Sequence, residues 1–360
     1  MNKLYRLRQS VGIIQLDDIV EFYKSNIRAG IKLKMKHESI INLLRQFNGE
    51  NSVAEILDKN PLINELQLAT LVNYLNSNYI LIETDQEYHT QITETHYRVI
   101  NLLEDYCRST SEVISSINKI KKSNVTIIGL GAVGSNIAIQ LAQSGVESFV
   151  LVDCDTVELS NLHRQFYFEN EISEFKVDAL SKKLHNFGAK HVKKIKKNLS
   201  EINLQNESSL VNTNLIINCA DEPSVDFTSE IIARHCMKFN IPHIVGGGYN
   251  LHQTLIGQTI IPYETACFNC FRIYLDSLNT SELAGVRKLH REGRKLGSYS
   301  PLSGIAASLA SLDSIKLLAG KKEYLQQVNK RIEFNLRSLK FNNSNVIRHP
   351  QCEWCGDNHG

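Results

Sequence analysis

The middle of the chain alternates between apolar runs of strand length and longer stretches with helical spacing. Residues 125–128 and 149–152 are largely apolar runs, and each predicts a buried strand, with an apolar helix between them that ends at Gly145. Further strands are predicted at residues 193–197, 215–218 and 243–245, with helices between them. This series predicts an α/β fold with a mostly parallel sheet and right-handed crossovers.

Residues 1–90 show a different pattern, with short β-like runs followed by helices. The runs are residues 12–16, 19–23 and 30–33. Three helical patterns follow: residues 40–47 with Gly49 as a C-cap, a helix opened by the capping box Ser52–Glu55, and a helix capped by Asn64. A strand at residues 79–83 closes the unit. The order predicts a winged-helix-like module.

The third helix of this module argues against DNA binding. Residues 65–76 contain no Lys or Arg that could meet phosphates. An exposed strand edge beside a helix can instead bind an extended peptide by β-augmentation. The module is therefore interpreted as a peptide-docking domain, and a dimerisation or packing domain is the alternative.

The rest of the chain completes a three-part division. Residues 91–122 are expected to form a helical connector, and residues 123–360 the α/β domain. Within that domain, residues 271–300 are interpreted as an irregular crossover loop, 301–319 as a helix and 331–342 as one strand. The lysine-rich run 190–197 alternates, as in an edge strand with charged outer positions.

Composition excludes several classes of protein. The 360 residues are 42% hydrophobic and 22% charged, which is typical of a globular chain. The formal net charge of +2 gives no sign of nucleic-acid binding. No apolar run approaches the ~20 residues that span a bilayer, and no signal peptide is evident. We expect a cytoplasmic protein without membrane or nucleic-acid partners.

Four of the eight cysteines form two Cys-x-x-Cys pairs, Cys267/Cys270 and Cys352/Cys355. Two such pairs predict a tetrahedral four-thiolate Zn²⁺ site, with a redox pair as the alternative. A closed four-cysteine site has no open coordination position, which makes the zinc structural. Cys154 and Cys219 lie in strand-like runs and are interpreted as small core residues.

A glycine-rich turn follows the first strand of the α/β domain. Gly129, Gly131 and Gly134 stand between that strand and the next helix, where glycines let the backbone approach phosphates. Asp153 ends the second strand, where an acidic residue normally binds a ribose hydroxyl. Taken alone, this Rossmann-like arrangement favours a nicotinamide oxidoreductase.

Three further segments change that interpretation. Residues 153–165 (DCDTVELSNLHRQ), 174–178 (EFKVD) and 218–221 (NCAD) resemble, in this order, the diagnostic segments of the ThiF, MoeB and ubiquitin-activating-enzyme superfamily. With the zinc pairs, the resemblance covers about residues 124–358. It implies an adenylating enzyme that uses ATP and Mg²⁺.

The resemblance also implies roles for single residues. Arg164, Lys176 and Asp221 would form the catalytic core, with Asp221 holding Mg²⁺. The implied ATP-binding set is Gly129, Gly131, Gly134, Asp153, Asp155, Asn161, Arg164, Gln165, Lys176, Leu199 and Asp221. Cations around a polyanion are what phosphate cleavage requires.

The superfamily also supplies an arginine across a homodimer interface. The superfamily carries this arginine in a short Arg-Tyr-x-Arg segment before the nucleotide domain, and residues 95–99 (THYRV) are a degraded form of it. Arg98 is therefore the first choice for the catalytic arginine, and Arg108 is the alternative. Many relatives use a transfer cysteine after the nucleotide domain, but this chain has none between Cys270 and Cys352. A thioester would need another thiol, such as Cys236. Residues 287–300 are either a lid over the substrate or a solvated loop.

A peptide-docking module fused to an adenylating domain without a transfer cysteine resembles the enzymes that modify ribosomally made precursor peptides. Residues 246–250 and 300–308 resemble those of the microcin C7 type, whereas the N-terminal unit favours the pantocin A type. The expected function is activation of a carboxylate or amide in a precursor peptide, leading to dehydrative cyclisation. The alternatives are an adenylyltransferase that leaves a nucleotide on the peptide C-terminus, a sulfur-carrier adenylyltransferase, and a non-enzymatic docking subunit.

Overall fold

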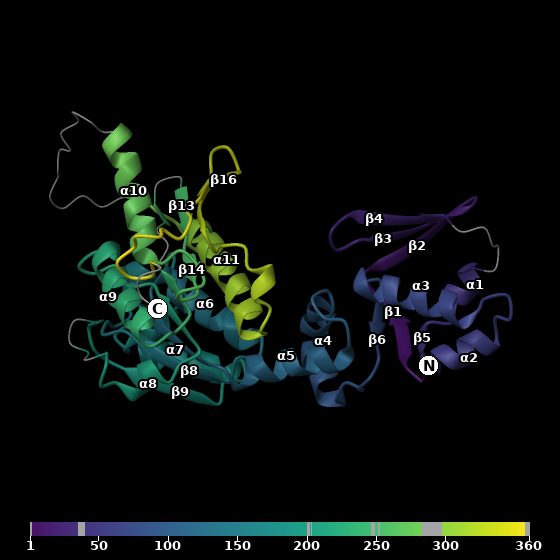
Figure 1. The fold of residues 1–360 in the computed structure, drawn as a ribbon. Helices are drawn as coiled ribbons and strands as arrows, with labels where there is room; N and C mark the ends of the chain where they lie inside the picture. Colours follow the sequence, from purple (N-terminus) through teal and green to yellow (C-terminus); the bar gives the residue numbers. More distant parts are fainter. Residues whose placement is uncertain are drawn as a thin grey trace. The chain divides into compact units, whose positions relative to one another are not determined.

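The computed structural model describes residues 2–34, 40–199, 202, 204–245, 249–250, 253–282 and 297–356. The chain divides into two compact units, residues 1–118 and 119–360 (Figure 1). Within the described residues, every helix is too short or too polar to cross a membrane.

The first unit contains two three-stranded sheets. One has the order β5-β1-β6, formed by Asn48–Ser52, Leu4–Leu7 and Leu81–Glu83. The other has the order β2-β3-β4, an antiparallel meander of Val11–Leu16, Ile19–Lys24 and Ala29–Lys34. The helices of this unit are α1 (Ile40–Arg45), α2 (Val53–Asp58), α3 (Glu65–Ser77) and α4 (Thr90–Glu104), while α5 (Thr110–Lys122) continues into the second unit.

Local sequence signals determine some of these elements and not others. The capping boxes at Ser52 and Asn64 are confirmed, since each side chain bonds the third backbone N–H of its helix. Strands β1 and β5 were not expected, and Gly49 is wrong as a C-cap. It lies in β5 with φ +89°. The polar sequence of β5 forms a strand only because β1 pairs with it.

One hydrophobic core lies under both sheets of the first unit. Phe22 from β3 and Leu68 and Leu75 from α3 are fully buried in it. The inward side chains of β4, Ile31 and Leu33, pack against the edge of this core. The alternation of β4 therefore turns its lysines away from the core.

The second unit is built on a six-stranded sheet with the order β14-β11-β10-β7-β8-β9. These strands are Gln258–Ile260, His243–Val245, Leu215–Asn218, Asn124–Ile128, Ser148–Val152 and His191–Ile195. All neighbours pair in parallel except β11 and β14. The predicted mostly parallel sheet is confirmed, and β9 is its edge strand, with lysines that form ion pairs on its outer side.

Helices and a second, four-stranded sheet complete this unit. The helices are α6 (Ala132–Gln143), α7 (Lys176–Asn186), α8 (Ser208–Val211), α9 (Val225–Lys238), α10 (Phe268–Glu282) and α11 (Ser300–Leu318), with short 3-10 turns at Leu159–Asn161, Glu169–Glu171 and Lys322–Tyr324. The sheet has the order β12-β13-β15-β16, from Tyr249–Asn250, Gln253–Ile256, Lys330–Asn335 and Lys340–Asn345.

Two expectations for this part of the chain are wrong. The first half of the loop expected at residues 271–300 is helix α10, whose apolar first turn is buried around Cys267 and Phe271; residues 283–296 lie outside the described part. The single strand expected at 331–342 is the hairpin β15–β16. Its turn has no glycine: the Asn335 Oδ1 accepts the Ser338 N–H at 3.1 Å, and Leu339 has φ +52°.

Candidate functional site

The glycine turn links β7 to α6 and leaves the helix N-terminus open. A Cβ placed on Gly129, which has φ +82°, would lie 2.6 Å from the Ala220 nitrogen. A Cβ on Gly134 would overlap the Gly129 carbonyl oxygen. Gly131 is the N-cap of α6 and forms no side-chain cap bond. Backbone N–H groups at such an open N-terminus are suited to bind phosphate oxygens.

Asp153 fixes this turn from the end of β8. Its Oδ2 accepts the Leu130 N–H at 2.6 Å, and its Oδ1 accepts the Asp155 N–H at 2.8 Å. Burial raises the pKa of Asp153, although the charge of Lys176 and these hydrogen bonds oppose the shift. The carboxylate therefore organises the loop, and its expected bond to a ribose hydroxyl stays a prediction.

Lys176 begins α7 and is buried, with its side-chain nitrogen 2.7 Å from the Asp155 carboxylate. Burial alone would raise the pKa of Asp155, but the hydrogen bond and the charge of Lys176 outweigh it, and the pKa is lowered. The Asp155 side chain is exposed, with a relative accessibility of 58%. The buried Lys176 ammonium is thus paired with the Asp155 carboxylate, which lies just after β8 and is exposed to solvent.

Arg164, Asn161 and Gln165 follow in one irregular segment. The Asn161 Oδ1 accepts the Glu158 N–H at 3.1 Å, which stabilises the turn. Arg164 bonds the Ser160 carbonyl at 3.1 Å, and the described residues provide it no ion pair. The Gln165 Oε1 is buried without a hydrogen-bond partner, and its Nε2 lies 4.0 Å from a Cβ placed on Gly131. The unsatisfied Gln165 amide beside the glycine turn fits a bound nucleotide, and so does an Arg164 without an ion pair among the described residues.

Asp221 lies beyond the carboxyl end of β10. The parallel strands β7 and β8 end on the same side of the sheet. Asn218 fixes this connection, because its Oδ1 accepts the Ala220 N–H at 3.2 Å and its Nδ2 donates to Thr228 at 3.2 Å. Burial and the nearby Asp221 charge raise the pKa of Cys219 to about 12. The Asp221 carboxylate is exposed and forms no ion pair within the described ranges, so its oxygens are free to hold Mg²⁺.

Leu199, Arg98 and Arg108 are less informative. Leu199 is buried in the cluster that contains Val152 and Ile195, and its contact with adenine stays a prediction. Arg98 is exposed on α4, where its Nε donates to the Tyr97 hydroxyl at 2.9 Å. The Arg108 guanidinium lies 5.8 Å from the Tyr79 ring centre. Both arginines belong to the first unit, and the choice between them stays open.

The two cysteine pairs come together in the second unit. The sulfur of Cys267 lies 3.8 Å from that of Cys270 and 3.5 Å from that of Cys352, and the sulfurs of Cys270 and Cys355 are 3.5 Å apart. Tetrahedral zinc with bonds of about 2.3 Å needs sulfurs roughly 3.8 Å apart, so the cluster fits Zn²⁺. The Asn269 side chain and the His349 N–H donate to two of the sulfurs, as thiolates require.

The other cysteines differ from their interpretation in part. Cys154 and Cys219 are only half-buried, so both are wrong as core residues. The Cys154 thiol donates to the Asn198 side chain at 2.8 Å. Cys236 is fully buried, and burial raises its thiol pKa well above the usual value. A buried, protonated thiol is a poor nucleophile, which argues against a thioester there.

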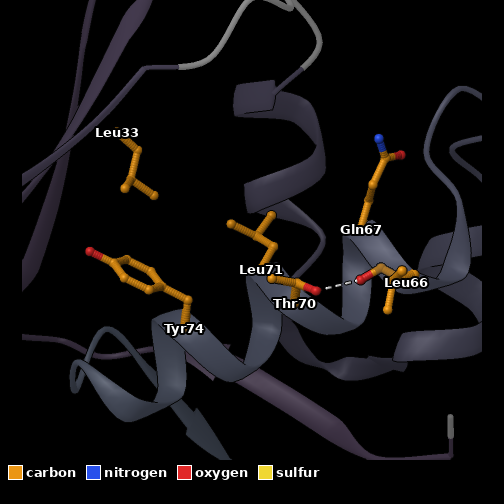
Figure 2. A pocket seen from close by; sticks show the side chains of 6 residues that line it. All are labelled: Leu33, Leu66, Gln67, Thr70, Leu71 and Tyr74. Carbon is orange, nitrogen blue, oxygen red and sulfur yellow. Dashed lines mark hydrogen bonds between the residues drawn. The ribbon is translucent and has the colours of Figure 1, made fainter.

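An apolar groove marks the first unit (Figure 2). Its lining residues are Leu33 of β4 and Leu66, Gln67, Thr70, Leu71 and Tyr74 of α3, and they enclose about 460 Å³. In Figure 2, Leu33 lies across from Leu71 and Tyr74. Among the strands that the structure describes, β4 pairs only with β3, so its other edge is unpaired. The sequence predicts a strand edge beside a helix but does not show which side chains form the groove.

Family comparison agrees with the site geometry. The family model described as "ThiF family" matches residues 107–354. The Escherichia coli molybdopterin-synthase adenylyltransferase is 26% identical over 241 residues, which cover 66% of this chain and 88% of that protein. The Escherichia coli sulfur carrier protein ThiS adenylyltransferase is 27% identical over 240 residues, again 66% and 88%.

Solved structures extend the similarity to nearly the whole chain. The fold of E. coli MccB matches with a TM-score of 0.76 at 22% identity, and the match covers 98% of this chain and 99% of MccB. PaaA matches with a TM-score of 0.70 at 20% identity, covering 95% and 100%. Both matches thus extend over the first unit, most of which lies outside the residues 107–354 that the family model matches.

Proposed function

Because the chain belongs to the ThiF family and is therefore an ATP-dependent enzyme, we propose that it activates a carboxylate or amide in a ribosomally made precursor peptide. The observation that carries this proposal is the apolar groove between α3 and Leu33 of β4, a strand with one edge unpaired among the described strands, in the same chain as the nucleotide site. A sulfur-carrier adenylyltransferase has no evident use for such a groove.

In this proposal, each part of the chain has its own task. Residues 1–90 bind the leader of the peptide, 91–122 form the connector, and 123–360 carry out activation. An extended leader adds a strand to β4 and places apolar side chains between Leu33 and Tyr74. Binding of the leader raises the effective concentration of the reactive part of the peptide at the ATP site. MccB, a microcin C7 biosynthetic enzyme, has been solved with N-formylated MccA and with ATP, which is consistent with this scheme.

The chemistry follows from the charges at the sheet edge. The α6 N-terminus, Arg164 and Lys176 bind the triphosphate, and Asp221 holds Mg²⁺, which supplies Lewis-acid stabilisation of the developing phosphate charge. A peptide oxygen attacks a phosphorus atom of ATP and displaces either pyrophosphate or ADP. A nitrogen of the same peptide then attacks the activated carbon and expels AMP or phosphate with the original oxygen. The peptide has then lost one water.

A second outcome has support from the fold comparison. The similarity to E. coli MccB favours a reaction in which the nucleotide stays on the peptide C-terminus. The PaaA similarity, together with the N-terminal unit, favours dehydrative cyclisation, which we take as the first choice. Both outcomes use the same ATP site and begin with attack of a peptide oxygen on ATP. They differ in the fate of the nucleotide, which is expelled when a peptide nitrogen attacks the activated carbon in the first outcome and stays on the peptide in the second.

We further propose a homodimer in which Arg98 completes the ATP site of the partner subunit. The family resemblance supports this arrangement, with Arg108 as the second choice. The exposed Arg98 guanidinium, which within the described residues contacts the neighbouring Tyr97 side chain, is available for such a contact.

The test combines a nucleotide and a peptide readout. The protein is incubated with Mg·ATP and the peptide encoded by a short neighbouring reading frame, and both are analysed by chromatography and mass spectrometry. Loss of one water from the peptide, dependent on ATP and abolished by Asp221→Asn, is the expected result. A peptide that retains a nucleotide supports the second outcome. ATP cleavage without any change of the peptide contradicts both and favours a sulfur carrier as substrate.

A further inference from the structure

Tyr167 is a buried residue next to the nucleotide site to which the sequence assigns no role. It is 4% exposed, and its hydroxyl donates to the Leu130 carbonyl at 2.8 Å. Leu130 is the middle residue of the glycine turn, and Tyr167 follows Arg164 and Gln165 closely in the chain. This hydrogen bond therefore joins the two segments from which the nucleotide site is built.

Both backbone polar groups of Leu130, its N–H and its carbonyl, form hydrogen bonds to side chains. Its N–H donates to the Asp153 carboxylate at 2.6 Å, while its neighbouring carbonyl accepts the Tyr167 hydroxyl. Among the described residues, the Tyr167 bond is the one hydrogen bond that connects segment 159–168 to residues 129–131. Without it, no hydrogen bond between described residues would join the segment that carries Arg164 and Gln165 directly to the turn.

The phenol ring in turn contacts a largely buried ion pair. The Lys183 nitrogen lies 5.4 Å from the ring centre and pairs with the Glu171 carboxylate. Glu171 also accepts the Phe168 N–H at 2.8 Å. Lys183 belongs to α7, the helix that begins with Lys176, so the ring contacts a third element of the site. Burial raises the pKa of the Tyr167 phenol well above its usual value, and the hydroxyl therefore remains a donor.

We propose that Tyr167 is a positioning residue for the triphosphate: its hydroxyl sets the spacing between the glycine turn and the segment that carries Arg164 and Gln165. The inference rests on the ATP site of the proposed function and adds a residue outside the expected ATP-binding set. A phenol is needed here because leucine or phenylalanine would leave the Leu130 carbonyl buried without a donor.

The experiment compares nucleotide binding by the wild-type protein, Tyr167→Phe and Tyr263→Phe. The matched control Tyr263 also donates to a backbone carbonyl of the same unit, that of Met237 at 3.0 Å, but lies outside the nucleotide site. Affinities for Mg·ATP and for adenosine are measured by titration calorimetry on the full chain. Since adenosine has no phosphates, it reports on the integrity of the remaining site.

We expect Tyr167→Phe to weaken ATP binding about tenfold, the effect of one buried hydrogen bond, and to leave adenosine binding unchanged. Tyr263→Phe should leave both affinities unchanged. The inference is overturned if Tyr167→Phe binds ATP like the wild type, or if it loses ATP and adenosine alike. Either result would leave peptide activation by the wild-type protein standing. A wild-type protein that fails to bind ATP would contradict the nucleotide site itself, and the inference with it.

Discussion

The nucleotide edge of the second unit, meaning the glycine turn at 129–134 and the residues that follow β8 and β10, and the apolar groove of the first unit are built in opposite ways. The nucleotide edge is polar, and the half-buried Asp153 and the buried Asn218 hold its loops through specific hydrogen bonds. The groove is apolar and open, and Leu66, one of its lining residues, is 76% exposed. The hydrogen-bonded loops preorganise a site that stabilises developing phosphate charge in one geometry. The open groove accepts any extended segment with suitable apolar side chains.

The largest effect is expected at the nucleotide edge, from Lys176→Met. Loss of a buried cation from the phosphate site should lower ATP turnover by about 10²–10³-fold. The matched control is Lys182→Met on the same helix, because Lys182 is exposed and pairs with Glu174. ATP consumption in the presence of peptide measures both variants. Equal activity of the two would remove Lys176 from the proposed mechanism.

A second prediction separates structural from chemical elements within the second unit. Cys355→Ala should lose the bound zinc and lower the melting temperature by roughly 10 °C or more, since a structural zinc contributes several kcal/mol to folding. Zinc content by elemental analysis and thermal unfolding give the two readouts. Cys107→Ala, a buried cysteine of the first unit, should keep its zinc. A wild-type chain without zinc would contradict the assignment of the cluster.

These contrasts also explain what the sequence could predict. Short motifs identified the nucleotide edge because its residues are placed by neighbouring residues in the sequence. The glycines directly follow β7, Asp153 directly follows β8, and Lys176 begins α7. Tyr167 escaped notice, since its role depends on the Leu130 carbonyl, which is distant in sequence. The sequence could not have marked it as buried, because residues 166–168 are an unbroken aromatic run in which Phe166 and Phe168 are exposed.

The first unit was harder to predict for a related reason. Its groove combines Leu33 with α3, and these are brought together only by packing. Strand β5 is polar and depends on its pairing with β1. Helix α10 was missed because its charged, polar outer face resembles a loop, whereas the cysteine cluster that fixes its start is contributed partly by the chain's last residues. Tertiary context decided each of these elements.

A third prediction asks whether the nucleotide site is completed by a second copy. Arg98→Ala and Asp221→Asn should each be inactive alone. If Arg98 acts across the interface, mixing the two variants should restore about a quarter of the wild-type sites, because half of the dimers are mixed and each has one intact site. Repeating the mixture with Arg108→Ala distinguishes the two arginines. Absence of recovery with both would place all catalytic groups in one subunit.

A further prediction concerns the acid stability of the second unit. His243 of β11 is fully buried, and burial lowers its pKa to about 4. The unfolded chain binds a proton near the ordinary pKa of 6.5, so stability is complete above that value and falls as the pH drops from 6.5 toward 4. The loss at pH 5 should be about 2 kcal/mol. Urea unfolding at pH 7 and pH 5 measures it, and His243→Gln should reduce the difference.

The central claim is that the groove and the nucleotide edge serve one reaction, and a matched pair of variants tests it most directly. Leu66 lines the groove and Leu62 does not, yet both side chains are 76% exposed. ATP-dependent modification is measured against peptide concentration for Leu66→Glu, Leu62→Glu and the wild type. We predict that Leu66→Glu raises the KM for peptide at least about tenfold with little change in kcat at saturating peptide, while Leu62→Glu matches the wild type. Identical peptide KM values for Leu66→Glu and the wild type would contradict the claim.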